Sequence, residues 1–253
     1  MHVILTGATG LVGSGVLDAM INTKDITKIS ILARRPVQLA EDAKDPRINV
    51  IIHKDFEKYD AELLEKLQGA RGCVWALGIS QTQVGAEEYV KITKTFTLEA
   101  AKAFQSLASE EQPFNFVYVS GAGATTEPGR FTQIFARVKG ETESALAELR
   151  KEKPSFRASS ARPAYVDASA HDAIKPYLPN KPLPISLLES LVGGPIRFGL
   201  KSFHSPTEPL GRALTEIAMG RYQDQLVAGK GIQMIGQFPI LENSVLRQVV
   251  GLR

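Results

Sequence analysis

The sequence predicts an α/β fold with a doubly wound parallel sheet. Three observations support this fold class. A glycine-rich loop follows an apolar strand at the start of the chain, apolar runs then alternate with helical patterns, and 253 residues with 43% hydrophobic side chains can bury a sizeable core. Strands separated by helices indicate a parallel sheet covered on both faces, and right-handed crossovers wind it in both directions. We expect one domain over 1–253, with about 164–253 on its substrate side.

The first strand, Val3–Leu5, leads directly into a loop with glycines at Gly7, Gly10 and Gly13. In a dinucleotide-binding loop the first glycine permits a tight turn, the second lets a pyrophosphate approach the backbone, and the third lets the next helix pack closely. A helical pattern over 11–22 follows, so its free N–H groups and positive dipole end would face the phosphates. An ordinary glycine-bearing turn between a strand and a helix is the alternative.

Further apolar runs predict strands in order along the chain, of which the last is weak in β propensity: Ile29–Leu32, Val50–Ile52, Cys73–Leu77, Phe116–Val119 and Arg157–Ser160. Helical patterns separate them near 61–68, 86–108 and 131–151. The 86–108 helix has broad apolar faces that we expect to pack on the sheet. The alternative for part of it is a second subunit in a homodimer.

The alternation of strand and helix patterns ends after residue 163. Five prolines and a glycine pair interrupt residues 176–195, which predicts irregular structure suited to a lid or a substrate wall. A plain surface loop is the alternative. A helix near Pro209–Gly220 and a strand near Ile232–Ile235 follow.

The end of the second strand indicates which dinucleotide binds. Arg34 and Arg35 follow that strand directly, with no acidic residue beside them. A carboxylate there would bond the ribose 2′-hydroxyl of NAD, whereas arginine accommodates the 2′-phosphate of NADP. We therefore expect NADP(H) to be preferred over NAD(H), the alternative being a pair of solvated surface arginines. Asp55 and Phe56, just past the third strand, are candidates to contact the adenine, and an ordinary turn is the alternative.

Charge and composition point to a small-molecule substrate. The formal net charge is +3 and no block of like charge indicates a nucleic-acid arm, so we expect no nucleic-acid partner. No apolar run is long enough to span a bilayer, and the four histidines show no metal-ligand spacing, so we expect neither a membrane span nor a metal. Cys73 is the single cysteine, and we expect it to be buried. This lone cysteine and a first strand at residue 2 or 3 lead us to expect a cytoplasmic protein without a leader.

Several short motifs occur in an order that resembles an atypical short-chain dehydrogenase/reductase. They are Thr6-Gly7-Ala8-Thr9-Gly10-Leu11-Val12-Gly13, Ala33-Arg34-Arg35-Pro36, Leu77-Gly78, Tyr118-Val119-Ser120-Gly121-Ala122, Val138-Lys139-Gly140-Glu141 and Arg162-Pro163. The stretches at 85–90 and 135–143 are similar to the Tat-interacting-protein oxidoreductase-like group and its fungal relatives. The resemblance covers about residues 2–165 and is thin beyond them. It implies an NAD(P)-binding Rossmann fold and a peripheral association with mitochondria.

The resemblance also implies roles for individual residues. Ser120 matches the serine that hydrogen-bonds the substrate carbonyl, and Lys139 matches the lysine that holds the nicotinamide ribose. The tyrosine that normally donates the proton is Phe135 here, and phenylalanine has no proton to give. Tyr118 and Tyr165 are candidate replacements, with ordinary packing as the alternative for each; Tyr165 is the one we add to the catalytic set. The expected cofactor-binding residues are Thr6, Gly7, Thr9, Gly10, Leu11, Val12, Gly13, Arg34, Arg35, Asp55, Phe56, Leu77, Gly78, Lys139 and Pro163.

Two functions remain open on the sequence. The first is an NADP-dependent oxidoreductase that reduces a small carbonyl or enone compound with a non-standard proton donor. The second is a catalytically silent NADPH-binding sensor that acts through a protein partner. The retained Ser120 and Lys139 favour the first, and Phe135 favours the second. The resembled group also includes epimerase-, dehydratase- and isomerase-like activities.

Overall fold

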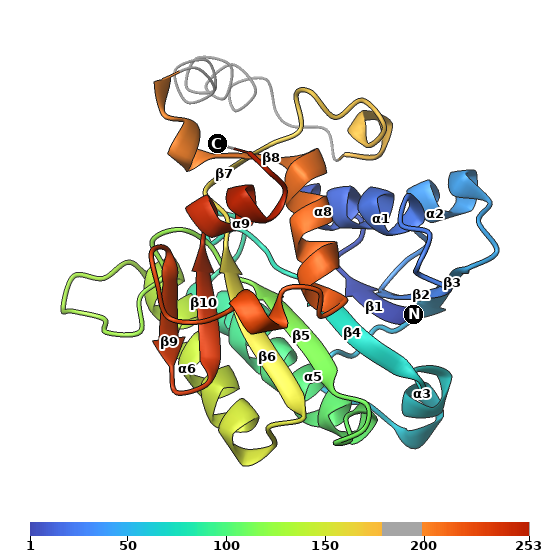
Figure 1. Ribbon diagram of the computed structural model, residues 1–253, viewed down its shortest axis with the longest axis horizontal. Helices are drawn as coiled ribbons and strands as arrows, with labels where there is room; N and C mark the ends of the chain where they lie inside the picture. Colours follow the sequence, from blue (N-terminus) through green and yellow to red (C-terminus); the bar gives the residue numbers. More distant parts are fainter. Residues whose placement is uncertain (179–198, 253) are drawn as a thin grey trace.

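The apolar runs of the sequence form one eight-stranded sheet in the computed structural model, which describes residues 1–178 and 199–252 (Figure 1). The strand order is β3 (Ile48–Ile52), β2 (Lys28–Ala33), β1 (His2–Thr6), β4 (Ala70–Trp75), β5 (Phe114–Val119), β6 (Phe156–Arg162), β10 (Phe238–Glu242) and β9 (Ile232–Ile235). All neighbours are parallel except β10 and β9. The order reverses beside β1, which confirms the predicted doubly wound α/β fold.

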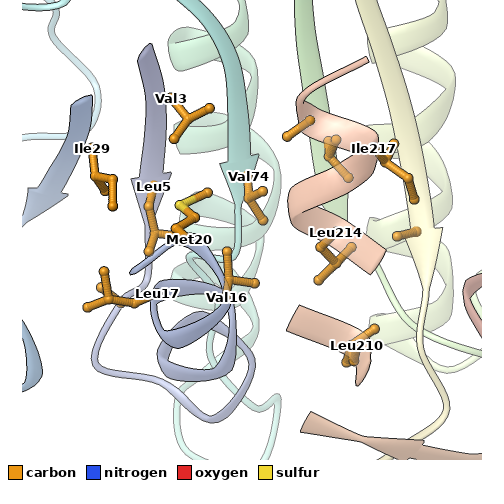
Figure 2. Packing of buried hydrophobic residues seen from close by; sticks show 14 of the residues in the cluster. Val3, Leu5, Val16, Leu17, Met20, Ile29, Val74, Leu210, Leu214 and Ile217 are labelled. Atoms are coloured by element: carbon orange, nitrogen blue, oxygen red, sulfur yellow. The ribbon is translucent and has the colours of Figure 1, made fainter. Parts of the chain in front are cut away.

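Helices cover both faces of this sheet because alternate strand residues point to opposite sides. Val3 and Leu5 of β1 face α1 (Leu11–Ile21) and α8 (Thr207–Ala218), whose side chains fill the space shown in Figure 2. Ile4 points the other way, into an aromatic-rich core beneath α5 (Phe96–Phe104) and α6 (Ile134–Glu152). Two hydrophobic cores therefore hold the central strands in place.

The predicted helices match the structure, with one internal irregularity. Patterns at 11–22, 61–68 and 131–151 correspond to α1, α3 (Ala61–Lys66) and α6. The 86–108 helix runs as α4 (Ala86–Val90), a π-helical turn over Lys91–Thr95, α5 and a short 3₁₀ turn. Its Tyr89 and Phe104 are buried in the core, as packing on the sheet predicts. The short α2 (Gln38–Ala43) is a helix that the pattern does not predict.

The C-terminal part completes the sheet and adds a small unit above it. The predicted helix at 209–220 is α8 and the predicted strand is β9, whereas β10 and α9 (Asn243–Val249) were not predicted. The strands β7 (Tyr165–Asp167) and β8 (His204–Pro206) form a separate two-stranded sheet beside the carboxyl end of β6 (Figure 1). Most of the expected irregular segment at 176–195 lies outside the described residues. Within the described ranges, no helix has the length and apolar character needed to cross a bilayer.

Candidate functional site

The three loop glycines have different steric reasons to be glycine. Gly7 has φ +70°, and a Cβ there would lie 2.3 Å from the carbonyl oxygen of Ala76. A Cβ on Gly13 would lie 2.0 Å from the carbonyl oxygen of Gly7, so helix α1 can approach β1 only without a side chain at that position. A Cβ on Gly10 meets only the Gly7 oxygen, at 3.3 Å. The fold therefore requires glycine at positions 7 and 13. Glycine at position 10 leaves the backbone there accessible from the adjoining cavity.

The start of α1 presents unused hydrogen-bond donors beside Gly10. The first helical hydrogen bond runs from the Ser14 N–H to the Gly10 carbonyl at 2.9 Å, and no side chain caps the helix. The N–H groups of Leu11, Val12 and Gly13 come before that ladder. Together with the helix dipole they make this end favourable for an anion.

Two cavities meet at the glycine loop. The larger, of about 970 Å³, extends from Gly10 past Ser120 and Lys139 to Tyr165. The smaller, of about 550 Å³, extends from Gly10 to Arg35. Both are bounded by Ala76, Leu77 and Gly78 after β4. This course along the carboxyl ends of the strands, where the strand order reverses, is where ligands bind in open α/β sheets.

Two arginines lie in the wall of the smaller cavity. Arg34 and Arg35 are exposed, and neither has an ion-pair partner among the residues that the structure describes. Their guanidinium groups are free to meet a ligand. Asp55 lies at an exposed turn 3.9 Å from Lys58, and it borders neither cavity. Phe56 is fully buried with its ring edge-on to Trp75, so its side chain is part of the core and does not reach an adenine site.

Ser120 directly follows β5 and lines the larger cavity. Its backbone N–H donates to the Ala161 carbonyl at 2.8 Å, and the Ala122 N–H donates to the Pro163 carbonyl at 2.8 Å. These bonds fix the loop after β5 against the end of β6. The Ser120 side chain is 3% exposed, and its hydroxyl oxygen has no hydrogen-bond partner. Buried hydroxyl groups rarely remain unpaired, so this one is available to a ligand.

Lys139 reaches the same point from α6. Its ammonium group donates to the backbone carbonyl of Ser120 at 2.5 Å, and its side chain lines the larger cavity. Burial lowers the pKa of Lys139 to about 8, and the carboxylate of Glu143 opposes that effect in part. The group therefore changes charge close to neutral pH.

A buried ionic cluster lies one turn further along α6. The side chain of Glu143, a residue type that is usually exposed on an amphipathic helix, is fully buried. The carboxylate accepts from Ser160 at 2.8 Å and from Arg162 at 3.0 and 2.5 Å, and Arg162 also donates to Glu242 at 3.0 Å. Buried charges persist only when they are paired in this way.

The three aromatic candidates for a proton donor have different surroundings. Phe135 packs under Gly123, because a Cβ on that glycine would lie 3.4 Å from the Phe135 Cζ. The Phe135 ring is not part of the cavity wall. Tyr118 is 1% exposed, its hydroxyl has no partner, and burial raises its pKa well above the usual range. Tyr165, on β7, is half-buried in the wall of the larger cavity.

Sequence reasoning missed several residues of the cavity wall, among them Thr93 and Phe203. Thr93 lines the larger cavity from the π-helical turn, and Phe203 lines it from the segment before β8. A π-helical turn is often found at functional sites, and it leaves no mark in hydrophobic periodicity. Phe203 lies beyond the irregular segment, where the sequence carries no motif.

Most expected cofactor residues lie along the two cavities. The residues that line them are Gly7, Thr9, Gly10, Leu11, Val12, Arg34, Arg35, Leu77, Gly78, Lys139 and Pro163. Thr6 is buried, and its hydroxyl accepts from the Leu77 N–H at 3.2 Å, so it joins β1 to the end of β4. Cys73 is fully buried, as expected, and burial raises the pKa of its thiol. No group of three or more metal-binding side chains occurs in the described ranges.

Comparison with known sequences identifies relatives over most of the chain. It is 38% identical to leucinostatins biosynthesis cluster protein T of Purpureocillium lilacinum, over 90% of this chain and 89% of that protein. It is 42% identical to botcinic acid biosynthesis cluster B protein 16 of Botryotinia fuckeliana, over 61% of this chain and 98% of that protein. Identity to the mitochondrial protein fmp52 of Emericella nidulans is 29%, over 58% of this chain and 61% of that protein. No family model matches the chain.

Solved structures share the fold at low sequence identity. A dTDP-glucose 4,6-dehydratase from Streptomyces venezuelae, solved with NAD, superposes with a TM-score of 0.64 at 16% identity, over 100% of this chain and 92% of that chain. A short-chain dehydrogenase/reductase from Saccharomyces cerevisiae superposes with a TM-score of 0.59 at 13% identity, over 87% of this chain and 90% of that chain. The chain thus has a Rossmann fold like that of these dehydratase and dehydrogenase/reductase structures, and it belongs to the family that includes leucinostatins biosynthesis cluster protein T and is related to fungal fmp52.

Proposed function

We propose that this protein is an NADP(H)-dependent reductase of a small carbonyl or enone compound. One observation carries the proposal. Ser120 has a buried hydroxyl without a hydrogen-bond partner, and its backbone carbonyl accepts a hydrogen bond from the Lys139 ammonium, in a cavity that continues to the glycine loop. A hydroxyl donor at that point polarises an acceptor carbonyl. The relatives named for biosynthetic clusters support a role in the synthesis of a small molecule.

The residues present fit a nicotinamide dinucleotide. Gly10 and the first N–H groups of α1 would receive the pyrophosphate, since no side chain fills that space. Arg34 and Arg35 would meet the 2′-phosphate, which makes NADP(H) the preferred form. When bound, the reduced cofactor supplies a hydride.

The protein's own groups then have separate tasks. Ser120 donates a hydrogen bond to the substrate oxygen, and the bonds of the Ser120 and Ala122 amides keep it in position. Lys139 would hold ribose hydroxyls of the cofactor with the N–H groups that are not bonded to the Ser120 carbonyl. Leu11 and Val12 line the cavity beside Gly10 and would give the nicotinamide an apolar wall.

The test is NADPH consumption against a panel of aldehydes, ketones, enones and quinones, with Ser120→Ala as the diagnostic variant. The Ser120 hydroxyl makes no hydrogen bond within the protein, so its removal should leave the melting temperature unchanged. We expect turnover of at least one compound class, and a loss of about 10²-fold or more in kcat on removal of the donor. Ser106→Ala, an exposed serine after α5, is the matched control. An equal rate in the Ser120 and Ser106 variants would contradict the proposal.

A second candidate is a catalytically silent NADPH sensor, favoured by Phe135. Phe135 stands where the family has a tyrosine, has no hydroxyl proton to donate, and packs under Gly123. Phe131, on the loop that leads to α6, is 92% exposed and offers an aromatic side chain to a protein partner. NADPH binding without turnover of any panel compound would support this candidate over the reductase.

A further inference from the structure

Reduction of a carbonyl needs a proton donor, and Phe135 cannot supply one. Among the described residues, the titratable side chains that line the larger cavity are Tyr118, Lys139 and Tyr165. The proton must come from one of these groups or from solvent.

Tyr118 is poorly placed for this task. Its hydroxyl oxygen is fully enclosed and has no hydrogen-bond partner, and burial among Glu143 and Tyr89 holds its pKa well above the usual range. A donor must also exchange its proton with solvent after each turnover, and an enclosed phenol does so slowly. Tyr165 lies in the cavity wall on β7, and it remains a rival that experiment can separate.

Lys139 has the geometry that the task requires. Its Nζ donates a hydrogen bond to the backbone oxygen of Ser120, the residue whose buried hydroxyl has no hydrogen-bond partner. The next position, Gly121, carries no side chain, and a Cβ there would lie 3.4 Å from Nζ, so the ammonium is not enclosed from that side. Lys139 is half-buried and lines the cavity, which leaves its remaining protons open to a ligand or a water.

We propose that Lys139 is the proton donor of this site, in place of the missing phenol. The inference rests on the proposed reductase function. A C–H bond forms at the carbonyl carbon with the hydride that the reduced nicotinamide supplies, and the C=O π electrons move onto oxygen. An N–H bond of the Lys139 ammonium breaks and an O–H bond forms, directly or through one water. The nitrogen keeps the electron pair, and the neutral amine regains a proton from solvent.

The surroundings of Lys139 support this role. Glu143 on α6 stabilises the ammonium form, but its charge is already paired with Arg162 of β6. Tyr118 of β5 is neutral at working pH, because its pKa is raised by burial. Burial therefore dominates, and the pKa of Lys139 falls to about 8. A donor with a pKa near the working pH is the most effective general acid.

The first test reads the protonation of Lys139 without turnover. Lysines of the cofactor-free protein are ¹³C-methylated, and the Lys139 resonance is identified by its loss in Lys139→Arg. We expect the Lys139 resonance to titrate near pH 8. A Lys139 resonance that titrates at the ordinary pKa of a lysine would overturn the proposal.

The second test compares variants at saturating substrate. Lys139→Arg keeps a positive charge for the ribose and does not release a proton at these pH values. We expect NADPH affinity within about threefold of wild type and a fall in kcat of about 10²-fold or more. Added ethylamine should restore part of the activity of Lys139→Ala. Lys94→Arg, a lysine paired with Glu141 on the outer side of α6, is the matched control.

The outcomes separate the two proposals. A wild-type protein that binds no NADPH, or reduces no compound, contradicts the reductase function, while the resonance of Lys139 is still read. An active wild type with a fully active Lys139→Arg variant overturns the donor role of Lys139 alone. A larger loss in Tyr165→Phe than in Lys139→Arg assigns the proton to Tyr165 and also overturns it.

Discussion

Replacement of Lys139 by methionine should stabilise the protein at neutral pH. The folded state disfavours the ammonium form, because burial lowers the pKa of Lys139 from 10.5 to about 8. Between these two values the unfolded chain binds more protons than the folded one, so wild-type stability rises as pH increases through this window. The methionine variant lacks this dependence. Its advantage is therefore present below pH 8 and lost towards pH 10.5.

The magnitude follows from the same pKa values. The charged form of Lys139 costs the folded protein about 3 kcal/mol at pH 7, at about 1.4 kcal/mol for each tenfold change in proton affinity. Methionine also loses the hydrogen bond to the Ser120 carbonyl, which contributes about 1 kcal/mol. We expect a net gain of about 2 kcal/mol at pH 7 and a net loss of about 1 kcal/mol above pH 10.5.

Urea unfolding followed by the fluorescence of buried Trp75 measures this difference at intervals from pH 7 to 10.5. Comparison of wild type with variant cancels the titration of every other group. Lys102→Met, at an exposed lysine beside Glu99, is the matched control, and it should change the free energy of unfolding only slightly at pH 7. A difference for Lys139→Met that stays constant across the range would refute the reasoning.

Three further predictions test the site and its support. The protein should bind NADPH at least about ten-fold tighter than NADH, a difference of about 1.4 kcal/mol, and Arg34→Ala should reduce that preference. Equal affinities of the wild type for the two cofactors in titration calorimetry would contradict the prediction. Gly10→Val should abolish the rise in melting temperature on adding NADPH while the apo protein stays folded. Gly13→Ala should instead destabilise the apo protein, because its Cβ would lie 2.0 Å from a backbone oxygen. A rise in melting temperature that persists in Gly10→Val would argue against the phosphate loop. Arg162→Met should lower the free energy of unfolding in urea by about 3–5 kcal/mol, because it leaves Glu143 buried and unpaired. The double variant with Glu143→Leu should recover part of that loss. A loss below about 1 kcal/mol in the single variant would show that the pair is dispensable.

The sequence predicted the sheet well because its signals are local. The apolar runs at 3–5 and 116–119 lie in strands of the sheet core, and glycines at 7 and 13 fit contacts that only glycine permits. The strand β10, which lies between β6 and the edge strand β9, was missed because Pro239 interrupts its pattern, and its pairing partner β6 is distant in sequence. The π-helical turn was missed because one extra residue in a helix barely alters its periodicity.

The site was predicted in part, for similar reasons. Ser120 and Lys139 were found from motifs, and the fold brings them together from the end of β5 and from α6. Burial of Glu143 on α6 depends on its ion pair with Arg162 on β6, and the amphipathic pattern of a single helix does not reveal that partner. The proximity of Phe56 to the adenine site was inferred from chain order, but its ring turns inward to Trp75.

The central claim is that the two cavities form one NADP(H) site that ends at Ser120 and Lys139. A crystal structure of the protein with NADPH tests it most directly. The account predicts phosphates over Gly10 and the start of α1, the 2′-phosphate at Arg34 and Arg35, and the reactive carbon of the nicotinamide facing the Ser120 hydroxyl. Density for the cofactor at another surface, or a nicotinamide turned away from Ser120, would contradict it.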